Sequence, residues 1–282
     1  MLRQGGGRSP EARAKDASSS VEVRRLWAGM AMNFAVFLQQ RPRAGAEAQV
    51  LYERSLAILE SLHQQDAVNA EFALSLAEAL LNWGIFLMFN PSRRDEAGPI
   101  LTRGIAVLTP LAAREPELRR LRHALFALHG ARAQWLEGSK QWAEAAQDWR
   151  HSAEFATPEN RFRMQCQRSA ALAQAGQFRQ ARDLITDLAE HLPPDQPEYP
   201  LHLADVLCLC VKGCAASSDL PEEGRAKCQE AWTADAVALL TRHLDMTPAA
   251  KREQARKALL TRRELEPLAG HPAFMALTQA AR

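Results

Sequence analysis

Residues 80–106 read LLNWGIFLMFNPSRRDEAGPILTRGIA, and this stretch decides the fold that the sequence predicts. Apolar residues recur with helical spacing on both sides of an Asn-Pro-Ser turn, which predicts two helices joined by a short connection. The first helix carries Trp83 and the small Gly84, and the second carries the small Ala97 and, one turn later on the same face, Leu101. Small residues beside large ones allow two helices to pack closely, so this stretch predicts a helical hairpin.

The same alternation of small and large residues returns elsewhere in the chain. A first copy lies 49 residues earlier, where Ala31, Phe34, Ala35, Leu38, Ala48, Tyr52 and Ser55 precede Leu80, Trp83, Gly84, Leu87, Ala97, Leu101 and Gly104. Two further copies are shorter, and they comprise Ala145, Trp149 and Ser152, and then Gly176, Phe178, Ala181 and Ile185. A hairpin that recurs at a near-constant spacing predicts a repeat protein, because one such unit cannot bury its apolar face alone.

This pattern resembles the tetratricopeptide (TPR) signature, W-x2-L-G-x2-Y followed by A-x3-F. The resemblance implies an all-α fold, a TPR-like α-solenoid of stacked helical hairpins. We expect a disordered tail, TPR-like repeats over 21–192 and then a C-terminal hairpin with capping helices; the ranges are 1–20 for the tail, 21–67, 68–115, 116–157 and 158–192 for the repeats, and 193–282 for the C-terminal part. No segment alternates with period two, so no sheet is expected.

Composition limits the function classes. The chain has 282 residues and a net charge of +2, which is too small to indicate binding to nucleic acid or to an anionic membrane. Neither a secretory signal nor the apolar run of about 18 residues that a membrane helix needs is evident. Five cysteines do not indicate a disulfide scaffold in a chain of this length. We therefore expect a cytoplasmic protein.

The chain is also similar to the TPR region C-terminal to the kinase domain of many bacterial serine/threonine protein kinases. The similarity rests on residues 76–84, 96–108 and 143–155, and on the closing segment RRELEPLAGHPAFMAL at 262–277. A kinase needs a Gly-rich loop, a His-Arg-Asp loop and an Asp-Phe-Gly segment, and this sequence has none of them. Two hypotheses follow: a non-catalytic protein–protein interaction module (a scaffold or adaptor), or the regulatory or substrate-docking region of a kinase whose catalytic domain is absent from this chain. Neither requires a cofactor.

Cysteines and aromatic residues have structural interpretations. Zinc would need four converging ligands, and the spacing of His202, Cys208, Cys210, Cys214 and Cys228 matches no common zinc pattern. We interpret these cysteines as small buried residues at a helix interface, and a metal- or redox-sensing domain built on this helix is the weaker alternative. We likewise predict that the aromatic residues at or near repeat positions fill the core between helices; they are Trp27, Phe34, Phe37, Tyr52, Trp83, Trp135, Trp142, Trp149 and Phe178.

Basic residues form a second candidate surface. The start of the third repeat carries a basic run, Arg114, Arg119, Arg120, Arg122 and His123, and Arg163 lies at the start of the fourth. Guanidinium groups suit carboxylate or phosphate partners, so Arg119, Arg122 and Arg163 are candidates for partner binding. The simpler interpretation, which we favour, is a solvated face balanced by Glu115, Glu117 and Glu159.

The TPR resemblance implies that the first helix of each pair lines a binding groove. The residues that should project there are Met32, Asn33, Val36, Leu81, Asn82, Ile85 and Met88. Leu81 and Ile85 stand where the Lys and Asn of a carboxylate clamp would be needed, so such a clamp is not expected. We instead expect an apolar groove for a helix or an extended segment of a protein partner, with no role in binding nucleic acid or membrane. The chain's own C-terminal helices are an alternative occupant.

Overall fold

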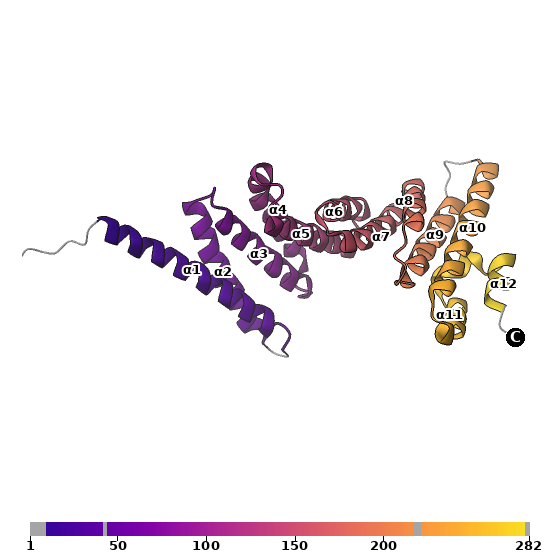
Figure 1. Cartoon of the computed structure of the whole chain (residues 1–282), viewed down its shortest axis with the longest axis horizontal. Coiled ribbons are helices and arrows are strands. Elements are labelled where there is room, and N and C mark those ends of the chain that lie inside the picture. The colour runs from indigo at the N-terminus through magenta and orange to yellow at the C-terminus, as the bar shows by residue number, and fades with distance from the viewer. Residues whose placement is uncertain (1–9, 42–43, 217–220, 280–282) are drawn as a thin grey trace, which may run out of the picture. The chain divides into compact units, whose positions relative to one another are not determined.

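The structure is a computed structural model and describes residues 10–41, 44–216 and 221–279, with side chains from residue 20 onward. These residues form α-helices and two short 3-10 helices joined by turns, with no strand among them (Figure 1). The predicted all-α class is confirmed. Of the predicted N-terminal tail, residues 1–9 lie outside the described residues, whereas residues 10–20 are helical, so the first helix begins earlier than the composition predicts.

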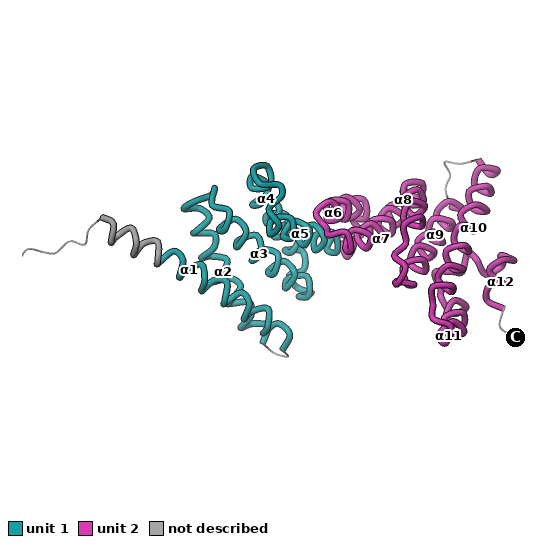
Figure 2. The backbone as a smooth tube through the Cα atoms, in the orientation of Figure 1, with its two compact units in different colours: residues 1–135 teal, residues 136–282 magenta. Residues whose placement is uncertain are grey.

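The chain divides into two compact units, residues 1–135 and residues 136–282 (Figure 2). The boundary falls inside helix α5 (Arg119–Gly138). Most of this helix therefore belongs to the first unit, and only its last turn belongs to the second.

Unit 1 is a succession of helices in which each packs on its neighbour in the chain. The elements are α1 (Pro10–Leu38), α2 (Gly45–Gln65), α3 (Ala70–Met88), η1 (Arg94–Glu96), α4 (Ala97–Arg114) and the first part of α5. Helix α2 packs on α1 and on α3, α3 packs on α4, and α1 also contacts α3. The α1–α3 contact brings together two helices that are not consecutive.

Glycines allow the closest approaches in unit 1. A Cβ atom added to Gly84 of α3 would lie 2.7 Å from Cδ2 of Leu101 of α4. One added to Gly104 of α4 would lie 2.7 Å from Cδ2 of Leu128 of α5. Both distances are shorter than real Cβ atoms show, so no larger residue fits either position without movement of its neighbour. The predicted role of Gly84, to let the helix after the turn approach closely, is confirmed.

Some aromatic rings of unit 1 are buried, and others are exposed. Tyr52 is fully buried, and its ring centroid lies 5.5 Å from that of Trp83. Its hydroxyl donates to Gln39, and burial raises the pKa of Tyr52 to about 12. By contrast, Trp27, Phe34 and Phe37 of α1 are 43–48% exposed. The prediction that these three rings fill the core is wrong, because they lie on the side of α1 that no described helix covers.

Unit 2 repeats the arrangement of neighbours in sequence. Its elements after α5 are α6 (Trp142–Phe155), α7 (Pro158–Gln174), α8 (Phe178–Glu190), α9 (Glu198–Ala216), α10 (Glu222–Met246), α11 (Ala249–Leu260), η2 (Arg263–Leu268) and α12 (Pro272–Gln279). From α6 onward each α-helix packs on the next, and α7 also packs on α9. A Cβ atom on Gly213 of α9 would overlap the ring of Phe178 of α8, so the ring occupies the space that the missing side chain leaves.

The closing segment of the chain is attached to α9. Arg262 donates from Nε and Nη2 to the two carboxylate oxygens of Asp205, at 2.8 and 2.5 Å. Leu265 and Leu268 of η2 and Phe274 of α12 are buried. A two-point ion pair and buried apolar side chains therefore both hold this segment in place.

Two helices are apolar enough to resemble membrane spans. Helices α3 and α9 each have a window of mean hydropathy 1.3, so the expectation that no such run exists is wrong. Half of each window is buried inside the structure. The core helix of a soluble protein passes the same test of length and composition, so this is weak evidence for a membrane span.

The cysteines lie in the interior, as predicted. Cys208, Cys210 and Cys214 of α9 are buried, and Cys228 of α10 is half-buried. Burial raises the pKa of the Cys208 and Cys210 thiols to about 12, so both stay protonated near neutral pH. Among the described residues, no group of three or more His, Cys, Asp or Glu side chains is arranged to hold a metal ion.

Candidate functional site

The site begins at the N-terminus of α3. Asn69 is the N-cap, and its Oδ1 accepts hydrogen bonds from the backbone amides of Glu71 and Phe72 at 3.0 and 3.2 Å. The cap satisfies two amides that have no partner within the helix. It also places the Glu71 carboxylate in the first turn, where the helix dipole favours a negative charge.

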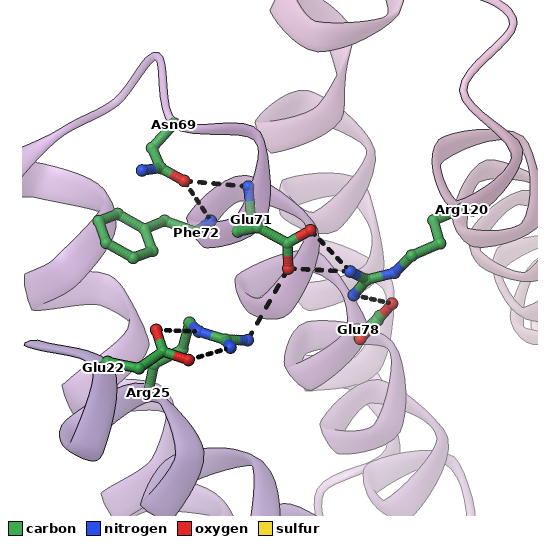
Figure 3. Close-up of polar contacts among 7 residues, drawn as sticks. All are labelled: Glu22, Arg25, Asn69, Glu71, Phe72, Glu78 and Arg120. Carbon is green, nitrogen blue, oxygen red and sulfur yellow. Dashed lines mark hydrogen bonds and ion pairs between the residues drawn. The ribbon is translucent and has the colours of Figure 1, made fainter.

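Glu71 connects three helices through two arginines (Figure 3). Nη1 of Arg120, from α5, lies 2.9 Å from each carboxylate oxygen of Glu71, and its Nη2 lies 3.2 Å from Glu78, about two turns further along α3. Nη1 of Arg25, from α1, lies 3.8 Å from Glu71, and the same guanidinium makes a two-point contact with Glu22. The five side chains form one network across α1, α3 and α5.

Each arginine of this network is paired with at least one carboxylate. The hydrogen bond to Glu71 raises the pKa of Arg120, and the hydrogen bond to Glu22 raises the pKa of Arg25. Conversely, the hydrogen bond from Arg25 lowers the pKa of the Glu22 carboxyl. Two cations and three carboxylates leave no net positive charge, so the network does not present a free cation for an acidic ligand.

A cleft of about 310 Å³ adjoins the network. Its lining comes mainly from α1 and α3, with Leu59 from α2 and Arg120 from α5; the residues are Arg25, Leu26, Gly29, Met30, Met32, Asn33, Leu59, Ser75, Glu78, Ala79, Asn82 and Arg120. Apolar and polar groups are mixed along it. Leu26 and Met30 are 52% and 72% exposed, whereas Leu59 and Ala79 are buried.

Two side-chain amides give this cleft its hydrogen-bonding character. Asn33 comes from α1 and Asn82 from α3. Each amide offers both donors and an acceptor, the combination that a peptide bond presents in return. Together with the exposed apolar side chains of Leu26 and Met30, the amides suit a partly apolar peptide segment better than a charged small molecule.

The structure brings together three of the ten residues predicted to bind a partner. Met32, Asn33 and Asn82 line the cleft. The others do not line it: Val36, Leu81, Ile85 and Met88 are half-buried on α1 and α3, Arg119 is exposed, Arg122 is half-buried, and Arg163 belongs to unit 2. Val36 and Met88 pack against the apolar core of unit 1.

Two arginines of the basic run, Arg114 and Arg120, have partners that are distant in sequence. The carboxylates nearest in sequence were expected to balance it, but Arg120 pairs with Glu71 and Glu78, more than 40 residues away. Arg114 donates to the backbone carbonyl of Val68 at 2.8 Å. In unit 2, Arg163 donates to Asn160 at 3.1 Å. Arginines of this run thus join helices of unit 1, in addition to facing solvent.

Sequence reasoning missed several residues of the cleft. Leu26 and Met30 stand four residues apart on α1, and their helical spacing is visible in the sequence. The i,i+3 pair of Arg25 with Glu22 is visible in the sequence, but the contacts of Arg25 with Glu71 and of Glu78 with Arg120 come from other helices. Only the fold places them beside the cleft.

Comparison with known proteins finds no family model and no curated relative that matches the chain.

Proposed function

We propose that this chain is a TPR-like α-solenoid that acts as a non-catalytic protein-interaction module, and that the α1–α3 cleft binds a peptide segment of its partner. The observation that carries the proposal is that Asn33 and Asn82 line one cleft together with exposed apolar side chains. Such a module needs no cofactor. We further propose that it works in the cytoplasm, with neither nucleic acid nor membrane as its partner.

Packing supports the solenoid part of the proposal. In a TPR array each helix contacts its neighbour in sequence, and the first helices of successive hairpins contact one another. Helices α1 and α3 have this relationship in unit 1, and α7 and α9 have it in unit 2. The close approach of Gly84 to Leu101 is the contact that the signature implies.

Electrostatics narrows the class of peptide. Arg25 and Arg120 are already paired with carboxylates, so a terminal carboxylate would have to displace Glu22 or Glu71. A segment without strong net charge avoids that competition. We therefore propose an internal peptide segment with one or more apolar side chains directed at Leu26 and Met30, its backbone bonded to the two asparagine amides.

Selection of peptides from a random display library against the whole purified chain tests the proposal. Replacing both asparagines, Asn33→Ala with Asn82→Ala, should weaken binding of the selected peptides at least about 5-fold, because each lost hydrogen bond is worth roughly 0.5–1.5 kcal/mol. Gln64→Ala, at an exposed amide of α2, is the matched control and should leave affinity unchanged. Equal binding by parent and double variant, or a selection that enriches no peptide, would contradict the proposal.

A further inference from the structure

The outward side of α1 carries an unusually apolar surface. Six large side chains, hereafter the outer face of α1, are 43–72% exposed there: Val23, Leu26, Trp27, Met30, Phe34 and Phe37. With 3.6 residues per turn they fall within an arc of about 100°. Of the exposed large apolar residues in the part of the chain that the structure describes, the majority lie on this one helix.

The opposite side of α1 is apolar too. Ala28, Met32, Ala35 and Leu38 are buried against the core of unit 1. A helix that is apolar on both sides is normally covered on both sides. The inner side meets α2 and α3, whereas on the outer face only Leu26 and Met30 border other helices, where they line the cleft.

The spacing of the outer face makes it complementary to itself. Val23 and Phe37 stand seven residues on either side of Met30, and Leu26 and Phe34 stand four residues on either side. A two-fold axis at Met30 would set large against smaller side chains in an antiparallel pair. Contact of one patch with its own copy is the form that two-fold dimers take.

We propose that two copies of this chain associate through an antiparallel pairing of their α1 helices, with the two-fold axis at Met30. A parallel pairing would bring together the two Arg41 guanidinium groups, each of which lies over its own Phe37 ring at 4.3 Å. It would also place Phe37 against Phe37 and Val23 against Val23, so that two large side chains would meet at one end of the contact and two small ones at the other. The antiparallel arrangement keeps the two arginines apart and places a large side chain opposite a smaller one.

The size of the surface fits this assignment. Since one aromatic side chain can bury about 150–250 Å², six large side chains at these exposures present on the order of 600 Å² per copy. A standard interface uses about 800 Å² from each partner, and about 1,000 Å² in total is the lower bound for a specific one. The outer face of α1 alone reaches that bound.

The pairing shares Leu26 and Met30 with the cleft, but its other members lie outside the cleft. Val23, Trp27, Phe34 and Phe37 do not line the cleft, and Asn82 is on α3. The asparagine variants that test peptide binding should leave association intact, whereas variants of the outer face of α1 are judged by the mass of the particle. Because a second copy would cover Leu26 and Met30, a selected peptide should compete with association, and the two proposals are judged by separate measurements, peptide affinity and particle mass.

The experiment is sedimentation velocity of the whole chain from about 1 to 100 µM. We expect a species of twice the chain mass of 31.3 kDa. Met30→Glu sets two like charges against each other at the two-fold axis and should raise the dissociation constant at least 100-fold. Phe89→Glu is the matched control, because Phe89 is 82% exposed but lies outside α1, and it should leave the constant unchanged.

Cross-linking tests whether the two α1 helices pair in the antiparallel direction. Met30→Cys lies on the axis, so mild oxidation should convert it to a covalent dimer faster than the parent, whereas Val68→Cys, also highly exposed, should not. Mixing Val23→Cys with Phe37→Cys should give a covalent heterodimer, which a parallel pairing would not form. Circular dichroism melts confirm that each variant folds.

Several results would overturn the proposal. One is a parent chain that stays monomeric up to 100 µM. Another is a dimer that Met30→Glu does not weaken or that Met30→Cys does not cross-link. A third is flotation of a monomeric parent with phosphatidylserine–phosphatidylcholine vesicles that Met30→Glu abolishes, since the outer face would then contact lipid and not a second copy.

Discussion

Gly84 and Leu101 lie so close that the Cγ of the leucine sits 2.8 Å from the place where a Cβ of residue 84 would stand. The leucine is fully buried, so its side chain has no free space to move into. The glycine thus sets the separation of α3 and α4.

Adding one methyl group at this point should destabilise unit 1. We expect Gly84→Ala to lower the free energy of unfolding by about 1–3 kcal/mol, the usual effect of overpacking. Gly29→Ala is the control: nothing lies within 4 Å of its Cβ position, and it should gain about 0.5–1 kcal/mol because alanine favours a helix. Denaturant melts of both variants measure the difference, and effects of the same sign would contradict this packing.

Ala97 should be equally intolerant of enlargement. It is fully buried at the start of α4, so Ala97→Leu forces a bulky group into a packed interface and should cost roughly 1–3 kcal/mol. Arg94→Ala, at an exposed position three residues earlier, should change stability by no more than about 0.5 kcal/mol. Equal shifts of the denaturation midpoint in the two variants would show that the repeat alignment is misplaced.

Glu137 should make unit 2 less stable at neutral pH than at acidic pH. Burial raises the pKa of its carboxyl above the ordinary 4.5, although the indole of Trp149 donates to it at 2.7 Å. As pH rises, the unfolded chain loses this proton before the folded chain does, so ionisation destabilises the fold from about pH 4.5 upward until the folded pKa is passed.

The substitution Glu137→Gln tests this directly, because the amide keeps an acceptor for Trp149 but cannot ionise. The variant should melt higher than the parent at pH 7, and the two should converge near pH 3. Glu144→Gln, at an exposed position of α6, is the control and should melt like the parent at both pH values. If Glu137→Gln leaves the chain no more stable than the parent at pH 7, then ionisation of Glu137 does not destabilise the fold.

Two arginines should differ in their effect on stability. Arg262 pairs with Asp205, whose side chain is only 12% exposed, whereas Arg120 and its partner Glu71 are each about half exposed. Arg262→Ala should cost about 1–3 kcal/mol because it leaves a shielded carboxylate without its partner. Arg120→Ala should cost at most about 1 kcal/mol, and less in 0.5 M salt. Urea melts at low and high salt compare them, and the reverse order would contradict this ranking.

The chain should not transfer phosphate. Phosphoryl transfer needs residues that hold metal and phosphate in fixed positions, and the sequence carries no such set. With radiolabelled ATP and magnesium, we expect no labelling of the chain or of a generic acceptor. Labelling that keeps a constant specific activity through two different purification steps would contradict a non-catalytic role.

Sequence reasoning predicted the helices and one of their contacts well. Periodicity identified the all-α class, and the small-before-large pattern identified Gly84 as a point of close approach. Both are local properties, since a glycine in an apolar helix already indicates where a neighbour can come near. The Arg120–Glu71 pair could not be predicted, because the two residues are 49 apart and neither lies in a motif.

The aromatic residues of α1 show a second limit of the sequence. Trp27, Phe34 and Phe37 have the spacing of core residues, yet they are 43–48% exposed. A pattern of apolar residues shows which sides of a helix avoid water, but it does not show what covers each side. The same limit applies to the cleft, which Asn33 and Asn82 line and Leu81 and Ile85 do not.

The carboxylate of Glu71 also restricts how this sequence can evolve. Because it interacts with both Arg25 and Arg120, a substitution at any of the three residues changes what the other two contribute to stability. A lineage that lost Glu71 would leave Arg25 with Glu22 and Arg120 with Glu78, so neither arginine would join its helix to α3 through residue 71 any longer. Variation at these positions, from three different helices, should therefore be inherited as a set.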